Sequence, residues 1–95
     1  MDIVTELLEE HADDSKWLQD YDQMKYQMNI GLAVRGARHD CNMTQRELAQ
    51  IAGVAHSTIA RIENGDVEPS LDTLRKIADA LGAKLNVSFE FSTAN

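Results

Sequence analysis

The 95-residue sequence contains little of what several common classes of protein require. Its single cysteine, Cys41, excludes an internal disulfide and is typical of a reducing cytoplasm. The three histidines are scattered, and with that cysteine they form no cluster with metal-ligand spacing. No apolar run is long enough to cross a membrane, and no secretory signal pattern opens the chain. We therefore expect a cytoplasmic protein with no metal, cofactor or membrane partner.

Positive charge is also scarce, because nine lysines and arginines stand against 16 acidic residues, a net charge of −7. The imbalance lies almost entirely at one end. Residues 1–28 hold eight acidic residues and two lysines, a net charge of −6. Residues 29–95 hold eight acidic and seven basic residues. The sequence therefore predicts an acidic arm attached to a small, nearly neutral unit, and such asymmetry indicates two kinds of partner.

The most informative segment is 44–65, which is typical of two short helices joined by a tight turn. Thr44 and Glu47 form a predicted capping box at the first helix. Gly53 allows the positive φ of a sharp turn, and Gly65 can end the second helix. The residues expected to face inward are Leu48, Ala49 and Ile51 in the first helix and Ile59 and Ile62 in the second. The pattern predicts a helix-turn-helix, whose second helix can enter the major groove of DNA.

The run T-Q-x-x-L-A…G-V…S-T-I-x-R-I-E-N-G resembles the XRE, or Cro/lambda-repressor-like, helix-turn-helix family over about residues 30–82. The resemblance implies a recognition helix at about 56–63. The candidate DNA-binding residues are Gln45, Arg46, His56, Ser57, Thr58, Ala60, Arg61 and Asn64. Arg61 is the strongest candidate, because a guanidinium can bind guanine O6 and N7 together. Gln45 is expected to bind phosphate at a helix N-terminus, whereas Arg46 and Arg35 are equally consistent with solvated surface charges.

Two further positions follow from the same resemblance. Glu63 would repel DNA, so we expect it to be structural and to pair with Arg38 on the preceding helix. Ala55 stands where this family often has a capping serine or threonine, so the recognition helix is expected to lack a side-chain cap or to start elsewhere.

Helices are also predicted on both sides of this motif. The first covers 2–12, and Asp13 and Asp14 break it and cap a second helix. The hydrophobic phase then shifts near 29–31, which predicts a new helix or a kink. Its apolar stripe is Ile30, Val34, Ala37 and Cys41, with Cys41 in the core and Asn42 at the helix end. A last helix runs from Ser70 to Gly82, with Leu74, Ile77, Ala78 and Leu81 facing inward. The predicted fold class is all-α, with about five helices and a lambda-repressor-like core.

Residues 84–91 alternate strictly between apolar and polar side chains, which predicts a single β-strand. Its apolar residues are Leu85, Val87, Phe89 and Phe91. A lone strand needs a partner, so we expect two copies to pair antiparallel in a homodimer. Pairing with a sheet edge of another protein is the alternative. The chain is thus divided into an arm (1–28), a DNA-binding domain (29–83) and a dimerisation strand with a tail (84–95).

The size, the tail and the layout resemble the HigA-like antitoxins of bacterial type II toxin–antitoxin pairs. This resemblance implies a basic, mRNA-cleaving HigB/RelE-like toxin as partner, and repression of the protein's own operon through a palindromic operator. The candidate toxin-binding residues are Leu7, Leu8, Glu9, Glu10, Asp13, Asp14, Trp17, Asp20 and Tyr21. In the alternative, the apolar stripe of the arm folds back onto the core.

The alternative function is a free-standing phage- or plasmid-type repressor without a toxin. Catalysis is not expected, since Ser57 lacks a plausible His and Asp set. His39 and Cys41 lie two apart on one predicted helix and so do not face each other. No small-molecule substrate is predicted.

Overall fold

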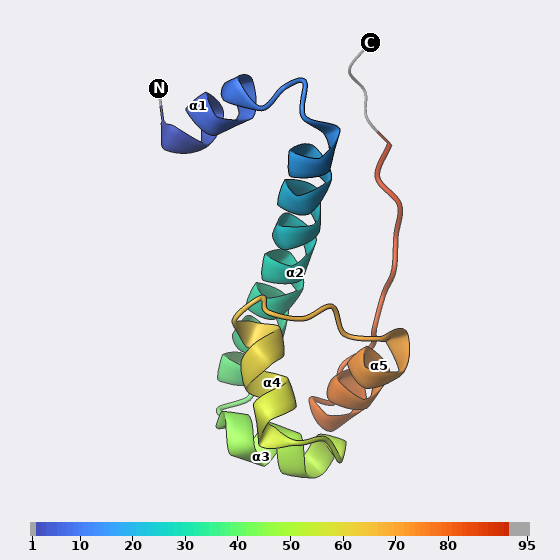
Figure 1. Ribbon diagram of the computed structural model, residues 1–95. Coiled ribbons are helices and arrows are strands. Elements are labelled where there is room, and N and C mark those ends of the chain that lie inside the picture. The colour runs from blue at the N-terminus through green and yellow to red at the C-terminus, as the bar shows by residue number, and fades with distance from the viewer. Residues whose placement is uncertain (1, 92–95) are drawn as a thin grey trace.

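The computed structural model describes residues 2–91, and in this range it consists of five α-helices without a β-strand. The helices are α1 (Ile3–Glu10), α2 (Ser15–Asp40), α3 (Gln45–Ala52), α4 (His56–Glu63) and α5 (Leu71–Ala80). In Figure 1, α3, α4 and α5 gather around the C-terminal half of α2, whereas α1 and the N-terminal half of α2 extend away from them. The helix-turn-helix core and the number of helices agree with the sequence prediction.

The predicted C-terminal strand is wrong. Residues 83–91 follow an extended path without regular secondary structure, and in Figure 1 this tail runs back past α2. A strand exchanges backbone hydrogen bonds with a neighbour, and the described residues contain no second extended segment that could serve as one. The remainder of the predicted tail, 92–95, lies outside the described residues, as does residue 1 of the arm.

Local interactions set the helix ends as the sequence predicts. The Asp14 side chain caps α2 by accepting from the Trp17 backbone N–H at 2.9 Å. At α3, Thr44 Oγ1 accepts from the Glu47 N–H at 3.1 Å, and the Glu47 carboxylate accepts from the Thr44 N–H at 2.9 Å. Asn42, with φ of 55°, lies in the left-handed region just after α2. These contacts join residues three or fewer apart, so they can be predicted from the sequence.

The sequence predicts a new helix or a kink near residues 29–31. Helix α2 is a single helix of 26 residues, so the first of these alternatives, the new helix, is wrong. The boundary drawn between the arm and the DNA-binding domain lies inside it. The phase shift has a packing cause, because the C-terminal half of α2 lies against α4 and the N-terminal half does not. Gly31 lies at this crossing, where an added Cβ would be 2.4 Å from the Ile62 carbonyl oxygen. A helical glycine costs only about 1 kcal/mol, too little to break a packed helix.

The core lies between the C-terminal half of α2 and the three following helices. Its buried apolar residues are Val34, Leu48, Ala49, Ile59, Ile62, Ile77 and Ala78. Two predicted core residues are exposed instead: Ile51 is 60% exposed, and Cys41 lies at the surface beside the Leu81 carbonyl. No residue of α1 is buried. None of the described helices is both long and apolar enough to cross a bilayer.

Candidate nucleic-acid interface

The turn between α3 and α4 sets the angle at which α4 leaves the core. Gly53 adopts a φ of 74°, and the Val54 N–H donates to the Ala49 carbonyl at 3.0 Å. Helix α4 is then fixed by Ile59 and Ile62, which are at most 1% exposed. As expected, Ala55 makes no side-chain cap for α4. The opposite side of α4 faces solvent and is available for a groove of DNA.

The predicted DNA-binding residues lie on or next to α3 and α4. Those that are exposed are Arg46, His56, Ser57, Arg61 and Asn64, and those that are partly buried are Gln45, Thr58 and Ala60. His56, Ser57 and Arg61 therefore stand on the solvent side of the recognition helix. Their contacts with DNA stay predictions.

The pair of Glu63 and Arg38 is confirmed. The Arg38 guanidinium donates from Nε to Glu63 Oε2 at 2.7 Å and from Nη2 to Oε1 at 2.9 Å. Arg38 Nη1 also donates to the Met43 carbonyl at 2.8 Å, and this hydrogen bond joins the end of α2 to the loop before α3. The Glu63 side chain is fully buried. Arg35, one turn earlier on α2, points its Nε to Glu63 Oε1 at 3.5 Å, so it faces this carboxylate.

The Glu63 carboxylate is ionised despite its burial. Burial by itself raises the pKa of Glu63, but hydrogen bonds from Arg38, Gln45 and Arg35 outweigh that effect and hold the pKa below its ordinary value. The hydrogen bonds that Arg38 donates to Glu63 in turn raise the pKa of Arg38. The pair is thus charged on both sides and neutral as a whole, so Glu63 adds no repulsion toward DNA.

The structure also shows a contact that the sequence analysis missed. Gln45 donates from Nε2 to Glu63 Oε1 at 3.1 Å, and its Oε1 lies 3.3 Å from His56 Nε2. Gln45 was predicted to bind phosphate, yet both ends of its amide already have partners inside the protein. Gln45 and His56 are the first residues of consecutive helices, and only the angle of the turn brings them together. No sequence spacing signals that angle.

The arm presents its acidic residues to solvent. Of the predicted toxin-binding residues, Leu8, Trp17 and Tyr21 are partly buried, and Leu7, Glu9, Glu10, Asp13, Asp14 and Asp20 are exposed. The Trp17 ring stacks on the rings of His11 and Tyr21, with centroid distances of 4.3 and 5.5 Å, respectively. The aromatic side chains are thus used to join α1 to α2, and they do not reach the core.

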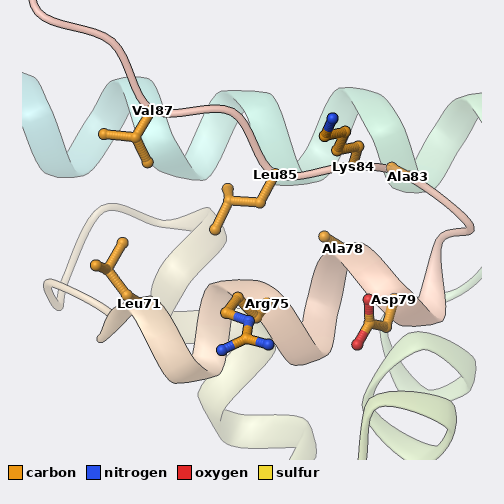
Figure 2. Close-up of a pocket in the computed structure, with 8 residues that line it drawn as sticks. All are labelled: Leu71, Arg75, Ala78, Asp79, Ala83, Lys84, Leu85 and Val87. Carbon is orange, nitrogen blue, oxygen red and sulfur yellow. The ribbon is translucent and has the colours of Figure 1, made fainter.

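The tail after α5 carries the predicted dimer residues in two different settings. Leu85 is partly buried and, in Figure 2, points from the tail toward α5 across a cavity of about 470 Å³. Val87, Phe89 and Phe91 are 68%, 85% and 88% exposed. The alternation in the sequence therefore does not correspond to one buried face in the single chain.

No group of three or more metal-ligating side chains is found within residues 2–91. What these residues do form is a capped helix, a glycine turn and an exposed second helix fixed on a buried core. That arrangement defines the helix-turn-helix class of DNA-binding proteins.

Comparison with known proteins gives the family. The helix-turn-helix family model matches residues 34–88, and the chain belongs to this XRE-type family of DNA-binding regulators, as the sequence motif predicted. The immunity repressor protein of Bacillus phage phi105 is 36% identical over 62% of this chain and 41% of its own length. The putative antitoxin HigA2 of Mycobacterium tuberculosis is 36% identical over 58% and 55%, respectively. Antitoxin HigA1 of Mycobacterium tuberculosis is 34% identical over 64% and 41%. The chain thus spans about half the length of the curated relatives it matches.

Proposed function

We propose that this protein is the antitoxin of a toxin–antitoxin pair. In this proposal it represses its own operon by binding a palindromic operator as a dimer, and it neutralises a small, basic, mRNA-cleaving ribonuclease. The observation that carries the proposal is the separation of two surfaces. The acidic arm comprises α1, which has no buried residue, and the N-terminal half of α2, and it extends away from the core. The exposed face of α4 lies at the C-terminal end of α2.

Binding to the operator uses the solvent side of α4. Arg61 binds a guanine edge, and the hydroxyls of Ser57 and Thr58 donate to bases or phosphates. Ala60 offers only a methyl contact, and Asn64 and Arg46 bind the phosphate backbone. So few contacts give weak binding to a monomer. Two copies would double them and would present two α4 helices about 34 Å apart, one turn of DNA.

Dimerisation is supported by the apolar side chains that the single chain leaves in solvent. Val87, Phe89 and Phe91 are all more than two-thirds exposed. Exposed apolar surface of this kind marks an interaction site, and a second copy of the chain would cover it about a two-fold axis. In this dimer, Leu85 and these three residues contact the second copy through the packing of their side chains.

Toxin binding is assigned to residues 1–28. A ribonuclease presents a cationic surface to RNA, and the arm's net charge of −6 complements it. Its acids steer the encounter, and the apolar residues Leu7, Leu8, Trp17 and Tyr21 supply buried area in the complex. Two relatives named as HigA antitoxins support a toxin as the partner.

A second candidate is a free-standing repressor without a toxin. The match to a phage immunity repressor protein favours it. In that case the arm is a solvated appendage, and only the DNA-binding part of the proposal applies.

The test is co-expression with each neighbouring open reading frame, followed by affinity purification and size-exclusion chromatography with light scattering. We expect a stable complex with a small basic protein that is toxic when expressed alone. A homodimer that binds neither of the two neighbouring gene products would favour the free-standing repressor.

A deletion variant separates the two functions. The cut is best placed after residue 22, because the Gln27 amide already lies 3.3 Å from the Gly65 carbonyl and 3.2 Å from the Glu68 N–H. Loss of residues 2–22 should abolish neutralisation and leave operator binding intact. If both activities disappear while the helix content falls, the arm belongs to the core.

A further inference from the structure

Three hydrogen-bonded side chains form a row that leads from the buried end of the recognition helix to its exposed first residue. Glu63 is fully buried at the end of α4, Gln45 is the first residue of α3, and His56 is the first residue of α4. Gln45 lies between the other two, 3.1 Å from Glu63 Oε1 and 3.3 Å from His56 Nε2. Each group in the row determines which atom of the next group faces it as a donor or as an acceptor.

The ionised carboxylate of Glu63 determines how the Gln45 amide is turned. A carboxylate can only accept hydrogen bonds, so the amide group that faces it must be the NH2 group. Arg38 donates to both carboxylate oxygens and holds Glu63 in place. The Gln45 carbonyl oxygen therefore points away from Glu63, toward His56.

The orientation of Gln45 in turn determines where neutral His56 carries its proton. An amide oxygen accepts and never donates, so the ring nitrogen that faces it, Nε2, must bear the hydrogen. The other nitrogen, Nδ1, then has a free lone pair. His56 is exposed, and no hydrogen bond to its Nδ1 occurs within residues 2–91.

We propose that Glu63, acting through Gln45, fixes the tautomer of His56 and thereby makes this side chain a hydrogen-bond acceptor toward the operator. The inference rests on the proposed function and deepens it by naming a base preference. In the major groove an acceptor is matched by an amino group, which adenine offers at N6 and cytosine at N4. Guanine offers acceptors at N7 and O6 and is rejected at that position. Glu63 and Gln45 are positioning residues in this scheme, and His56 reads the base.

The decisive variant is Gln45→Lys, because an ammonium group only donates. The new ammonium group would still bind Glu63, but it would donate to His56 Nε2 and so move the proton of the imidazole to Nδ1. Gln45→Met, which neither donates nor accepts strongly, keeps the test decisive should the lysine variant fold poorly. Gln50→Ala is the matched control, since Gln50 is an exposed glutamine on the same helix.

The first readout is the long-range ¹H–¹⁵N spectrum of the imidazole nitrogens in the free protein at a pH where His56 is neutral. Wild type and Gln50→Ala should show a protonated Nε2 and an unprotonated Nδ1. Gln45→Lys should show the reverse, and Gln45→Met a mixture of both. An unchanged tautomer in both Gln45 variants would overturn the proposal.

The second readout is the affinity for an operator fragment in which each base pair is varied in turn. At one position in each half-site, wild type should prefer adenine or cytosine to guanine by roughly tenfold. Gln45→Lys should reverse that preference, and Gln45→Met should weaken it. Equal preferences in wild type and both Gln45 variants would contradict the proposal that Gln45 sets the base preference of His56.

The two readouts separate this inference from the proposed function. If wild type shows the expected spectrum and binds no fragment of its own upstream DNA, the proposed operator function fails and the assignment of the tautomer holds. If wild type binds its operator with the other tautomer, the operator function holds and the inference fails.

Discussion

At the scale of single residues, Glu63 affects both the stability of the fold and the position of the recognition helix. Its fully buried carboxylate accepts from Arg38 twice, from Gln45 and, at longer range, from Arg35. The motif I-E-N-G and its family resemblance were enough to predict the partner Arg38. They were not enough to predict Gln45, which the resemblance assigned to a phosphate.

Replacing Arg38 by methionine should destabilise the protein by about 3 kcal/mol, because it leaves Glu63 buried with most of its compensation removed. The free energy of unfolding, measured with urea, reports this loss. Arg46→Met removes an exposed arginine from α3 and should change stability by less than about 0.5 kcal/mol. An Arg38→Met protein as stable as wild type would mean that the pair is not needed to compensate the buried carboxylate.

Acid should weaken the fold through the same carboxylate. The pKa of Glu63 in the folded protein lies below its ordinary value of 4.5, so folding favours the ionised form. That contribution is complete above about pH 5.5, one unit above the ordinary value, and is lost as the pH falls through the lowered folded pKa. Urea unfolding between pH 7 and pH 3 measures it. The Glu63→Gln protein should be less stable at pH 7 and should lack this part of the pH dependence; an identical pH profile in the two proteins would contradict the assignment.

At the scale of helices and turns, the close crossing of α2 and α4 carries the architecture. Gly31 is buried there, and an added Cβ would lie 2.4 Å from the Ile62 carbonyl oxygen and 2.9 Å from that of Glu63. Both neighbours are backbone atoms and cannot move without shifting α4. The position of the recognition helix therefore depends on the absence of a side chain at Gly31.

Gly31→Ala should destabilise the protein by about 2 to 3 kcal/mol, the cost of overpacking against atoms that cannot yield. Gly36 is the matched control on the same helix, because a Cβ added there would meet nothing within 4 Å. Gly36→Ala should instead stabilise by about 0.5 to 1 kcal/mol through helix propensity. Thermal unfolding of the two variants followed by circular dichroism gives the comparison. Two shifts of the same sign would contradict the close crossing.

The same helices show how far the sequence could predict this fold and its site. The ends of α3 were readable, because the Thr44–Glu47 box and the Gly53 turn are formed by neighbours in the sequence. The continuity of α2 could not be predicted from the sequence. The shift in its apolar stripe marks the point at which α4 begins to pack against α2, and this packing is not visible in the sequence. The tail was misread for a related reason. Alternation of apolar residues is a necessary property of many strands, but a strand also needs a partner for its backbone.

At the scale of the whole molecule, the chain is elongated, with extents of 45 × 26 × 23 Å. Figure 1 shows α1 and the N-terminal half of α2, which belong to the acidic arm, at one end of the molecule and the helix-turn-helix at the other. The negative charge is thereby kept away from the surface that is proposed to approach phosphates. An acidic protein can bind DNA when its charges are separated in this way, and the acidic residues of the arm stay exposed for the proposed basic partner.

Charge neutralisation in the arm should slow association with the proposed basic toxin. The triple variant Glu9→Gln, Glu10→Gln and Asp13→Asn removes three charges from exposed positions. Wild type should associate more slowly as salt rises from about 50 to about 500 mM, and the variant should be slower at low salt and less sensitive to salt. Surface plasmon resonance measures both. The control is Asp66→Asn, Asp79→Asn and Glu90→Gln, which removes the same charge elsewhere, and equal effects of the two triples would rule out a specific role for the arm.

The sequence by itself determined the features that arise between near neighbours: the caps, the glycine turn, the two short helices of the motif and the uneven charge. Each depends on residues a few positions apart, whose geometry is set once the backbone conformation is set. The tertiary structure alone decided the row of Glu63, Gln45 and His56, the unbroken course of α2 and the absence of a strand from residues 83–91. These depend on atoms that are distant in the chain, and whether such atoms meet is set by how the helices pack.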